Sequence, residues 1–297
     1  MFESCHSDGA WDESLGRFFH CRREVRVRID VLTVFPDMFA ALDHTIPAKA
    51  RKLGALDLRV HGLRKHAVNR YGAVDDYPFG GEPGMVLRPE PIEKSLEEAL
   101  EGRPDVPVFY PCPHGEPLTQ ARVREWAAMP EMVILCGHYK GIDERIRYAY
   151  VTHEFSLGDF IVSGGELPTI AFIDALARLQ PGVLGDDGSA NTDSFEEPML
   201  GWPVYTRPEI WNGLRVPQAL LSGDHERIRK WRRAQQLQWT RERRPDLYER
   251  LELTSEDHLL LNPQDDVFLP LSTKLHASSR GKHHEHSADD PVPRPQG

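Results

Sequence analysis

The segment from Phe155 to Pro168, FSLGDFIVSGGELP, has the residue types of a ligand-binding turn. Its glycines lack a Cβ, so their backbone N–H and C=O groups can approach a bound molecule closely. An apolar run precedes Gly164 and Gly165, and an apolar helix-like run follows them. The order of strand, glycine-rich turn and helix favours a nucleotide-like ligand held by main chain at a helix N-terminus. Neither common phosphate fingerprint is present, so a purely structural turn is the alternative.

The composition is that of an ordinary globular protein. Of the 297 residues, 40% are hydrophobic and 28% are charged. No stretch approaches the roughly 20 apolar residues of a membrane span, so we expect no membrane association. Residues 1–24 contain acids and no apolar core, which does not fit a secretory signal. The four cysteines form no C-x-x-C pair, so we expect free thiols, a cytoplasmic location and no zinc.

Charge is distributed unevenly along the chain. The net charge of −10 argues against a nucleic-acid binder, but residues 223–251 contain nine Lys/Arg and five Asp/Glu. Residues 185–202 contain five acids and no base. Because a local basic face can bind a polyanion on an acidic protein, the C-terminal part remains a candidate for nucleic-acid contact.

Strand and helix patterns alternate over the first two thirds of the chain. Short apolar runs predict strands at Ile29–Phe35, Leu58–His61, Val106–Tyr110, Met132–Cys136 and Phe160–Ser163. Helical patterns lie between or after them, at 36–53, 91–101, 119–128, 142–150 and 168–180. This alternation is typical of an α/β fold with a mostly parallel sheet covered on both faces.

The chain divides into five predicted regions. We expect a disordered N-terminal extension at 1–24, an α/β domain at 25–184, a flexible loop at 185–202, a helical domain at 203–270 and a disordered, His-rich tail at 271–297. In the helical domain, Asp224 is predicted to cap a helix that packs through Trp231 and Trp239.

Seven strings, in this order, resemble the bacterial tRNA (guanine-N(1))-methyltransferases, the TrmD family. They are PFGGEPGM at 78–85, CGHYKGIDER at 136–145, the segment 155–168, ARLQPGVLG at 177–185, Asp193-Ser-Phe, YTRPE at 205–209 and SGDHERIRKWR at 222–232. The resemblance covers about residues 28–262, which is most of the chain.

The resemblance implies a SPOUT-type α/β fold with a deep trefoil knot, a small all-helical C-terminal domain for tRNA binding, and a homodimer with active sites at the subunit interface. The implied reaction moves a methyl group from S-adenosylmethionine to nitrogen 1 of the guanosine immediately 3′ of the anticodon. The knot follows from the resemblance alone, since chains as a rule avoid knots.

By resemblance, three loops that follow predicted strands would bind the methyl donor. The residues implied are Tyr110, Pro111, Cys112, Pro113, Gly115, Gly137, Tyr139, Gly141, Leu157, Gly158, Phe160, Val162, Ser163, Gly164, Gly165 and Pro168. For any one glycine, a tight turn without ligand contact is an equal alternative. Arg88 and residues 78–85 are further candidates for this pocket.

The resemblance also implies two catalytic residues. Guanine nitrogen 1 carries a proton, so a base is needed, and Asp193 matches the family's aspartate in that role. We expect closure of the acidic loop to desolvate Asp193 and raise its basicity. Arg178 matches the arginine that stabilises charge on the guanine oxygen. The alternatives are a turn or helix cap at Asp193 and an i, i+4 pair of Arg178 with Asp174.

Substrate contacts and metal dependence complete the expectations. By position, Tyr205, Arg207, Arg229, Lys230 and Arg232 are the expected tRNA contacts. Lys140 and Gly201 stand where many family members have acids linked to magnesium dependence. We therefore expect no metal ligands and a weak dependence on magnesium. The rival functions are a knotted methyltransferase for another RNA position and an RNA-binding module without catalysis.

Overall fold

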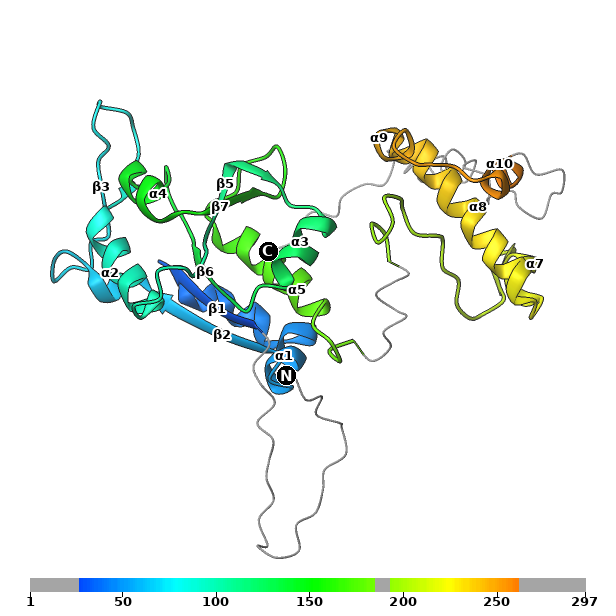
Figure 1. Cartoon of the computed structure of the whole chain (residues 1–297), viewed down its shortest axis with the longest axis horizontal. Coiled ribbons are helices and arrows are strands. Elements are labelled where there is room, and N and C mark those ends of the chain that lie inside the picture. Colours follow the sequence, from blue (N-terminus) through cyan, green and yellow to red (C-terminus); the bar gives the residue numbers. More distant parts are fainter. Residues whose placement is uncertain (1–26, 185–192, 262–297) are drawn as a thin grey trace, which may run out of the picture. The chain divides into compact units, whose positions relative to one another are not determined.

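The computed structural model describes residues 27–184 and 193–261. The chain forms two compact units, with the boundary before Asp193. Figure 1 draws the first unit from blue to green and the second from yellow-green to orange. The predictions for 1–24, for 185–192 and for the tail at 271–297 lie outside the described residues.

A five-stranded parallel sheet forms the centre of the first unit, as predicted. Its strands lie in the order β2-β1-β6-β5-β7, and all neighbours are parallel. The strands are β1 (Val27–Thr33), β2 (Leu56–Gly62), β5 (Val108–Pro117), β6 (Glu131–Leu135) and β7 (His153–Ser156). The short strands β3 (Asp75–Asp76) and β4 (Val86–Leu87) form a separate antiparallel pair.

The predicted strand Phe160–Ser163 is wrong, because these residues form a loop. The strand before the glycine turn is β7, which pairs with β5. Phe160 is 59% exposed and Ile161 is 79% exposed, so this apolar run does not fill the core. A short apolar run does not reveal whether its side chains pack in the core or line a cavity, and the prediction assumed the core.

Two layers of helices cover the sheet (Figure 1). On one face lie the 3-10 helix η1 (Pro36–Asp43), α1 (Thr45–Lys52), α3 (Gln120–Ala127) and α5 (Glu166–Arg178). On the other lie η2 (Leu63–His66), α2 (Pro89–Leu100) and α4 (Glu144–Tyr150). Both faces of the sheet are therefore buried.

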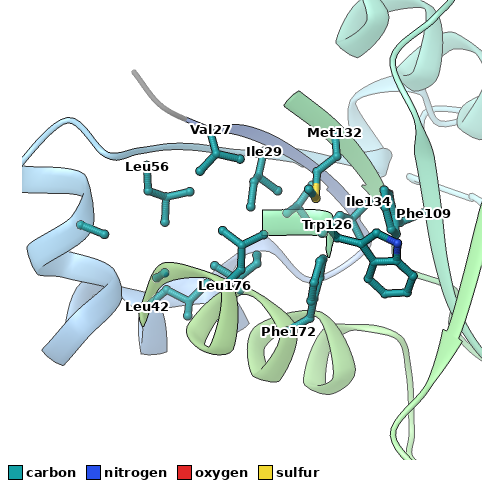
Figure 2. Close-up of a cluster of buried hydrophobic side chains, with 14 of the residues drawn as sticks. Val27, Ile29, Leu42, Leu56, Phe109, Trp126, Met132, Ile134, Phe172 and Leu176 are labelled. Carbon is teal, nitrogen blue, oxygen red and sulfur yellow. The ribbon is translucent and has the colours of Figure 1, made fainter. Parts of the chain in front are cut away.

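The alternation of side chains in β1 produces two cores. Ile29 belongs to the cluster packed against α5, whereas Leu32 belongs to the cluster packed against α2 and α4. In Figure 2, Phe172 and Leu176 rise from α5 toward Ile29 and its neighbours in the sheet. This packing fixes α5, and with it the glycine turn at its N-terminus, against the sheet.

The single helix predicted at 36–53 is instead two helices with a break at His44. Pro47 explains the break: proline has no N–H, and its ring clashes with the carbonyl four residues earlier in a continuous helix. A new helix that begins at Thr45 places Pro47 in the first turn, where no such bond is needed.

The second unit is built around the long helix α8 (His225–Arg243). Asp224 caps it as predicted, since its Oδ1 accepts from the N–H groups of Glu226 and Arg227. Trp231 is 1% exposed, while Trp239 is half-buried beneath the Arg243 guanidinium. The other helices in the described part of this unit are α7 (Gln218–Leu221), α9 (Pro245–Tyr248) and α10 (Ser255–Leu261).

A short hairpin in the second unit was not expected from its helical patterns. Strands β8 (Ile210–Trp211) and β9 (Leu214–Arg215) pair antiparallel around Asn212 and Gly213, which both have positive φ. Asn-Gly is the typical sequence of a two-residue hairpin turn, so this signal was present in the sequence. The described part of this unit is therefore not all helical.

Candidate active site

A cavity of about 310 Å³ lies beyond the carboxyl ends of β6 and β7, beside the irregular end of β5. This is the usual place for a ligand in a parallel sheet, and the size is within the range of small-molecule sites. Three segments line the cavity: residues 110–113 of β5, residues 137–141 after β6, and a third run that extends from the end of β7 into α5.

The structure brings together almost all of the predicted donor-site residues. Every one of the sixteen lines the cavity except Gly115. A Cβ on Gly115 would collide with the backbone of Phe155, where the β5–β7 register shifts between Pro111 and Glu116. Gly115 thus permits a close approach of two strands, and its role is in the fold rather than in lining the cavity.

The glycine turn packs directly on the loop after β6. The N–H of Gly165 donates to the carbonyl of Gly137 at 2.7 Å, and His138 forms an isolated bridge with Gly164. A Cβ on Gly165 would lie 3.0 Å from the Cα of Cys136 and the backbone nitrogen of Gly137. Only glycine leaves this backbone contact undisturbed.

The cavity wall is nearly neutral. Burial raises the pKa of Tyr110 to about 12 and also raises the pKa of the Cys112 thiol, so both groups stay protonated at neutral pH. The Cys112 thiol lies 3.7 Å from Glu154 Oε2, within hydrogen-bond reach. Hydrogen bonds from Arg147 lower the pKa of Glu154, whose charge is thereby balanced. Lys140 is the one lysine or arginine among the described lining residues.

Five lining residues were not among the sixteen predicted donor-site residues: His138, Lys140, Phe155, Ser156 and Ile161. All of them lie inside the recognised strings, within two positions of a selected residue. Their signal was therefore their position, because a loop that wraps a ligand contributes consecutive residues rather than its glycines alone.

Arg88 and residues 78–85 do not line this cavity. Arg88 instead forms ion pairs with Asp76 and Glu90. The loop 78–85 still contacts the site indirectly, since the backbone N–H of Lys140 donates to the Met85 carbonyl at 2.9 Å.

The two predicted catalytic residues lie in different units of the chain. Arg178 is half-buried and ends α5 in the first unit, and Asp193 is exposed at the start of the second. Residues 193–201 contain turns and bends but no helix, so Asp193 caps none there. This segment is tied to α8, because the Leu200 N–H donates to Thr240 Oγ1 at 3.0 Å.

Three of the seven lysines and arginines of α8, namely Arg229, Lys230 and Arg233, form ion pairs with acids in the described part of the chain. Arg229 binds Glu226 and Glu256, and Lys230 lies 3.4 Å from Glu226. Exposed pairs of this kind are weak, worth about 0–1 kcal/mol, so an RNA phosphate can compete for these cations. The pairing nevertheless makes α8 less positive than its count of basic residues suggests.

Arg232, Tyr205 and Arg207 differ in their surroundings. The Arg232 guanidinium lies 4.9 Å from the centre of the Trp202 ring, and no carboxylate partner is found for it in the described part of the chain. Tyr205 is half-buried against Trp231, and Arg207 is exposed. Of the predicted substrate contacts, Arg232 and Arg207 are the most available cations.

Within residues 27–184 and 193–261, no group of three or more His, Cys, Asp or Glu is arranged to hold a metal ion. The same residues include no helix that is both long and apolar enough to cross a membrane.

Comparison with known proteins assigns the family. The model of the family described as tRNA (Guanine-1)-methyltransferase TrmD matches residues 27–250. A tRNA (guanine-N(1)-)-methyltransferase of Moorella thermoacetica is 48% identical over 240 residues, which are 79% of this chain and 95% of the relative. The enzymes of the same name from Halalkalibacterium halodurans and Clostridium acetobutylicum are 45% and 42% identical, over 80% and 81% of this chain and 97% and 98% of their own. The chain therefore belongs to the TrmD family of tRNA (guanine-1)-methyltransferases.

Proposed function

We propose that this protein transfers a methyl group from S-adenosylmethionine to nitrogen 1 of the guanosine immediately 3′ of the anticodon in tRNA. The observation that carries the proposal is the backbone-lined cavity at the ends of β6 and β7, in a chain of the TrmD family. Fifteen of the sixteen residues proposed for the donor lie around this one cavity.

The cavity suits a small ligand with many polar edges. The backbone groups of Gly137 and Gly141 and of Gly164 and Gly165 in the glycine turn carry no side chain and can bind adenine edges and a bent methionine chain. When bound, S-adenosylmethionine supplies an electrophilic methyl group on a sulfonium. The loops contribute chiefly alignment, which is a large part of the rate in an in-line displacement.

The proposed chemistry needs a base and a cation. Asp193 would accept the proton of guanine nitrogen 1, so that the nitrogen lone pair can form the new bond to carbon as the carbon–sulfur bond breaks. Arg178 would stabilise the negative charge that grows on the guanine oxygen. Asp193 is exposed, and so is accessible to a substrate as large as tRNA.

The proposed assembly is a homodimer in which Asp193 of one protomer serves the site of the other, with a trefoil knot around the cavity. Mixing an Arg178→Ala protein with an Asp193→Asn protein under subunit exchange tests the shared site. Activity should reappear in the mixture, because mixed dimers contain one site with both native residues. An inactive mixture of proteins that demonstrably exchange subunits contradicts a shared site.

The C-terminal unit is proposed to bind tRNA in the cytoplasm. Arg232 and Arg207 are the main proposed contacts, and Arg229, Lys230 and Tyr205 are secondary ones.

Methyl transfer is proposed to depend little on magnesium. Lys140, a cation in place of an acid, lines the cavity, and its aliphatic chain lies against Gly84. Gly201 offers no carboxylate, and its N–H donates to Ser194. Chelation of magnesium should leave the single-turnover rate unchanged when tRNA folding is controlled; a steep loss contradicts this.

Incubation with labelled S-adenosylmethionine and bulk tRNA tests the function. Nuclease digestion and mass spectrometry should place 1-methylguanosine directly 3′ of the anticodon. A methyl group at another site would favour the rival enzyme, and tRNA binding without methyl transfer would favour a module without catalysis. Either result contradicts the proposal.

A further inference from the structure

A buried carboxylate lies directly behind the cavity wall. Glu166 is the first residue of α5 and is 1% exposed. Its Oε1 accepts a hydrogen bond from Thr33 Oγ1 at 2.7 Å. Its Oε2 is buried and has no hydrogen-bond partner in the described part of the chain. A buried carboxylate oxygen without a partner is costly, so this atom calls for an explanation.

His138 is the nearest candidate partner. Its Nδ1 is also buried without a hydrogen bond and lies 3.5 Å from Glu166 Oε2. An N–H···O hydrogen bond normally spans 2.7–3.2 Å, so a small movement would join the two atoms. His138 lines the cavity and Glu166 does not, so any effect of Glu166 on a ligand passes through His138.

The loop that contains His138 needs such support. Tyr139 has a positive φ of 60°, a conformation that is strained for a residue with a side chain. The His138 ring packs on Phe35 at 4.7 Å and on Tyr139 at 4.8 Å between ring centroids. The Phe35 N–H in turn donates to Thr33 Oγ1. Thr33, Glu166, His138 and Phe35 thus form a closed ring of contacts that joins β1, α5 and the cavity loop.

We propose that Thr33 and Glu166 are positioning residues that act through His138. In this proposal His138 Nδ1–H donates to Glu166 Oε2 when the cavity is occupied, and the bond holds residues 137–141 in the conformation that binds the donor. The inference rests on the proposed function, because it takes S-adenosylmethionine as the ligand. It assigns Glu166 no contact with the reacting atoms.

Calorimetric titration with S-adenosylhomocysteine, combined with steady-state kinetics, tests the proposal. Glu166→Ala should weaken binding by about 10-fold or more, since one buried hydrogen-bonding group loses its partner. The kcat at saturating donor should change little. Glu166→Gln should restore most of the affinity, because the amide oxygen can accept from Thr33 and the amide N–H can donate to His138 Nδ1 once the ring carries its proton on Nε2 instead. Leu176→Ala, a buried change in the same helix away from the cavity, is the stability control and should keep the affinity of the wild type.

A double variant tests the route through His138. The double variant with His138→Ala and Glu166→Ala should bind S-adenosylhomocysteine as well as His138→Ala alone. If the second substitution weakens binding as much as Glu166→Ala does in the wild-type protein, the proposal is overturned. Unchanged affinity in Glu166→Ala also overturns it. If Glu166→Ala does not fold, Thr33→Val takes its place and should weaken binding, with unchanged affinity as the contrary result. A wild-type protein that binds no S-adenosylhomocysteine would instead contradict the proposed function.

Discussion

The cavity beyond β6 and β7 and the surface of α8 present ligands with different kinds of groups. The cavity is lined by glycines, backbone and mostly neutral side chains, with Lys140 as the exception, and the Glu154 carboxylate beside Cys112 is balanced by Arg147. Helix α8 carries many cations, but Arg229, Lys230 and Arg233 have acidic partners. Recognition by backbone depends on close fit, whereas recognition by charge depends on which cations remain available. The two regions should therefore respond differently to substitution.

The largest effect is expected at Asp193. Asp193→Asn removes the proposed base and should slow single-turnover methyl transfer by about 10²–10⁴-fold, while the Kd for S-adenosylhomocysteine stays that of the wild type. Glu197→Gln, an exposed carboxylate in the same segment, is the matched control and should keep the rate. A normal rate in Asp193→Asn would show that Asp193 is not the base and would leave tRNA binding as the proposed role of the second unit.

A backbone substitution tests the cavity. Gly165→Ala places a Cβ 3.0 Å from the backbone of the neighbouring loop, and a shift there should weaken donor binding by roughly 100-fold. The affinity for tRNA should be unaffected. Gly62→Ala is the control, because its Cβ would meet only Pro36 Cγ at 3.8 Å, an ordinary contact. Equal donor affinities in both variants would show that close fit at Gly165 is unimportant.

Two arginine substitutions compare available with paired cations. Arg232→Ala should weaken tRNA binding several-fold and reduce its salt dependence. Each contact between a cation and a phosphate releases counterions from the RNA, so removing one contact lowers the number released. Arg229→Ala should have a smaller effect, because Glu226 and Glu256 already share its charge. Filter-binding titrations at several salt concentrations measure both. The opposite ranking would mean that the ion pairs of Arg229 break when RNA binds.

The smallest effect concerns the stability of the second unit. Hydrogen bonds from Arg233, opposed by burial, lower the pKa of Asp257 to about 2. Since an unfolded aspartate titrates near 3.9, this pair should contribute about 2 kcal/mol above pH 5 and lose it as the pH falls from about 4 to 2. Thermal unfolding of Asp257→Asn and wild type should therefore differ at pH 7 and converge near pH 2. A constant difference over this range would contradict a charge-based role.

Much of the first unit could be predicted because its signals are local. Apolar runs identified β1 and β6, and the glycine strings marked the loops that form the cavity. The wrongly predicted strand at Phe160–Ser163 has the apolar composition of a buried strand, but these residues form a loop that lines the cavity. The apolar pattern alone does not distinguish a core-facing strand from a cavity-facing loop. The break at His44 was signalled by Pro47, whose effect depends on its position in the turn.

The contacts between distant residues could not be predicted in the same way. The pairing of Thr33 with Glu166 spans 133 positions, and that of Arg233 with Asp257 joins two helices. A sequence gives the charge of each residue but not the partner that folding brings to it. The sequence therefore suggested a cationic surface along α8, and did not show that Arg229, Lys230 and Arg233 have acidic partners.

Single-turnover methylation of two matched tRNA transcripts tests whether this protein methylates the guanosine 3′ of the anticodon. One transcript has guanosine immediately 3′ of the anticodon, and in the other that base is replaced by adenosine. We expect one 1-methylguanosine per molecule in the first transcript and no methyl transfer to the second. Equal methylation of both transcripts, or of neither under conditions where S-adenosylmethionine binds, would contradict it.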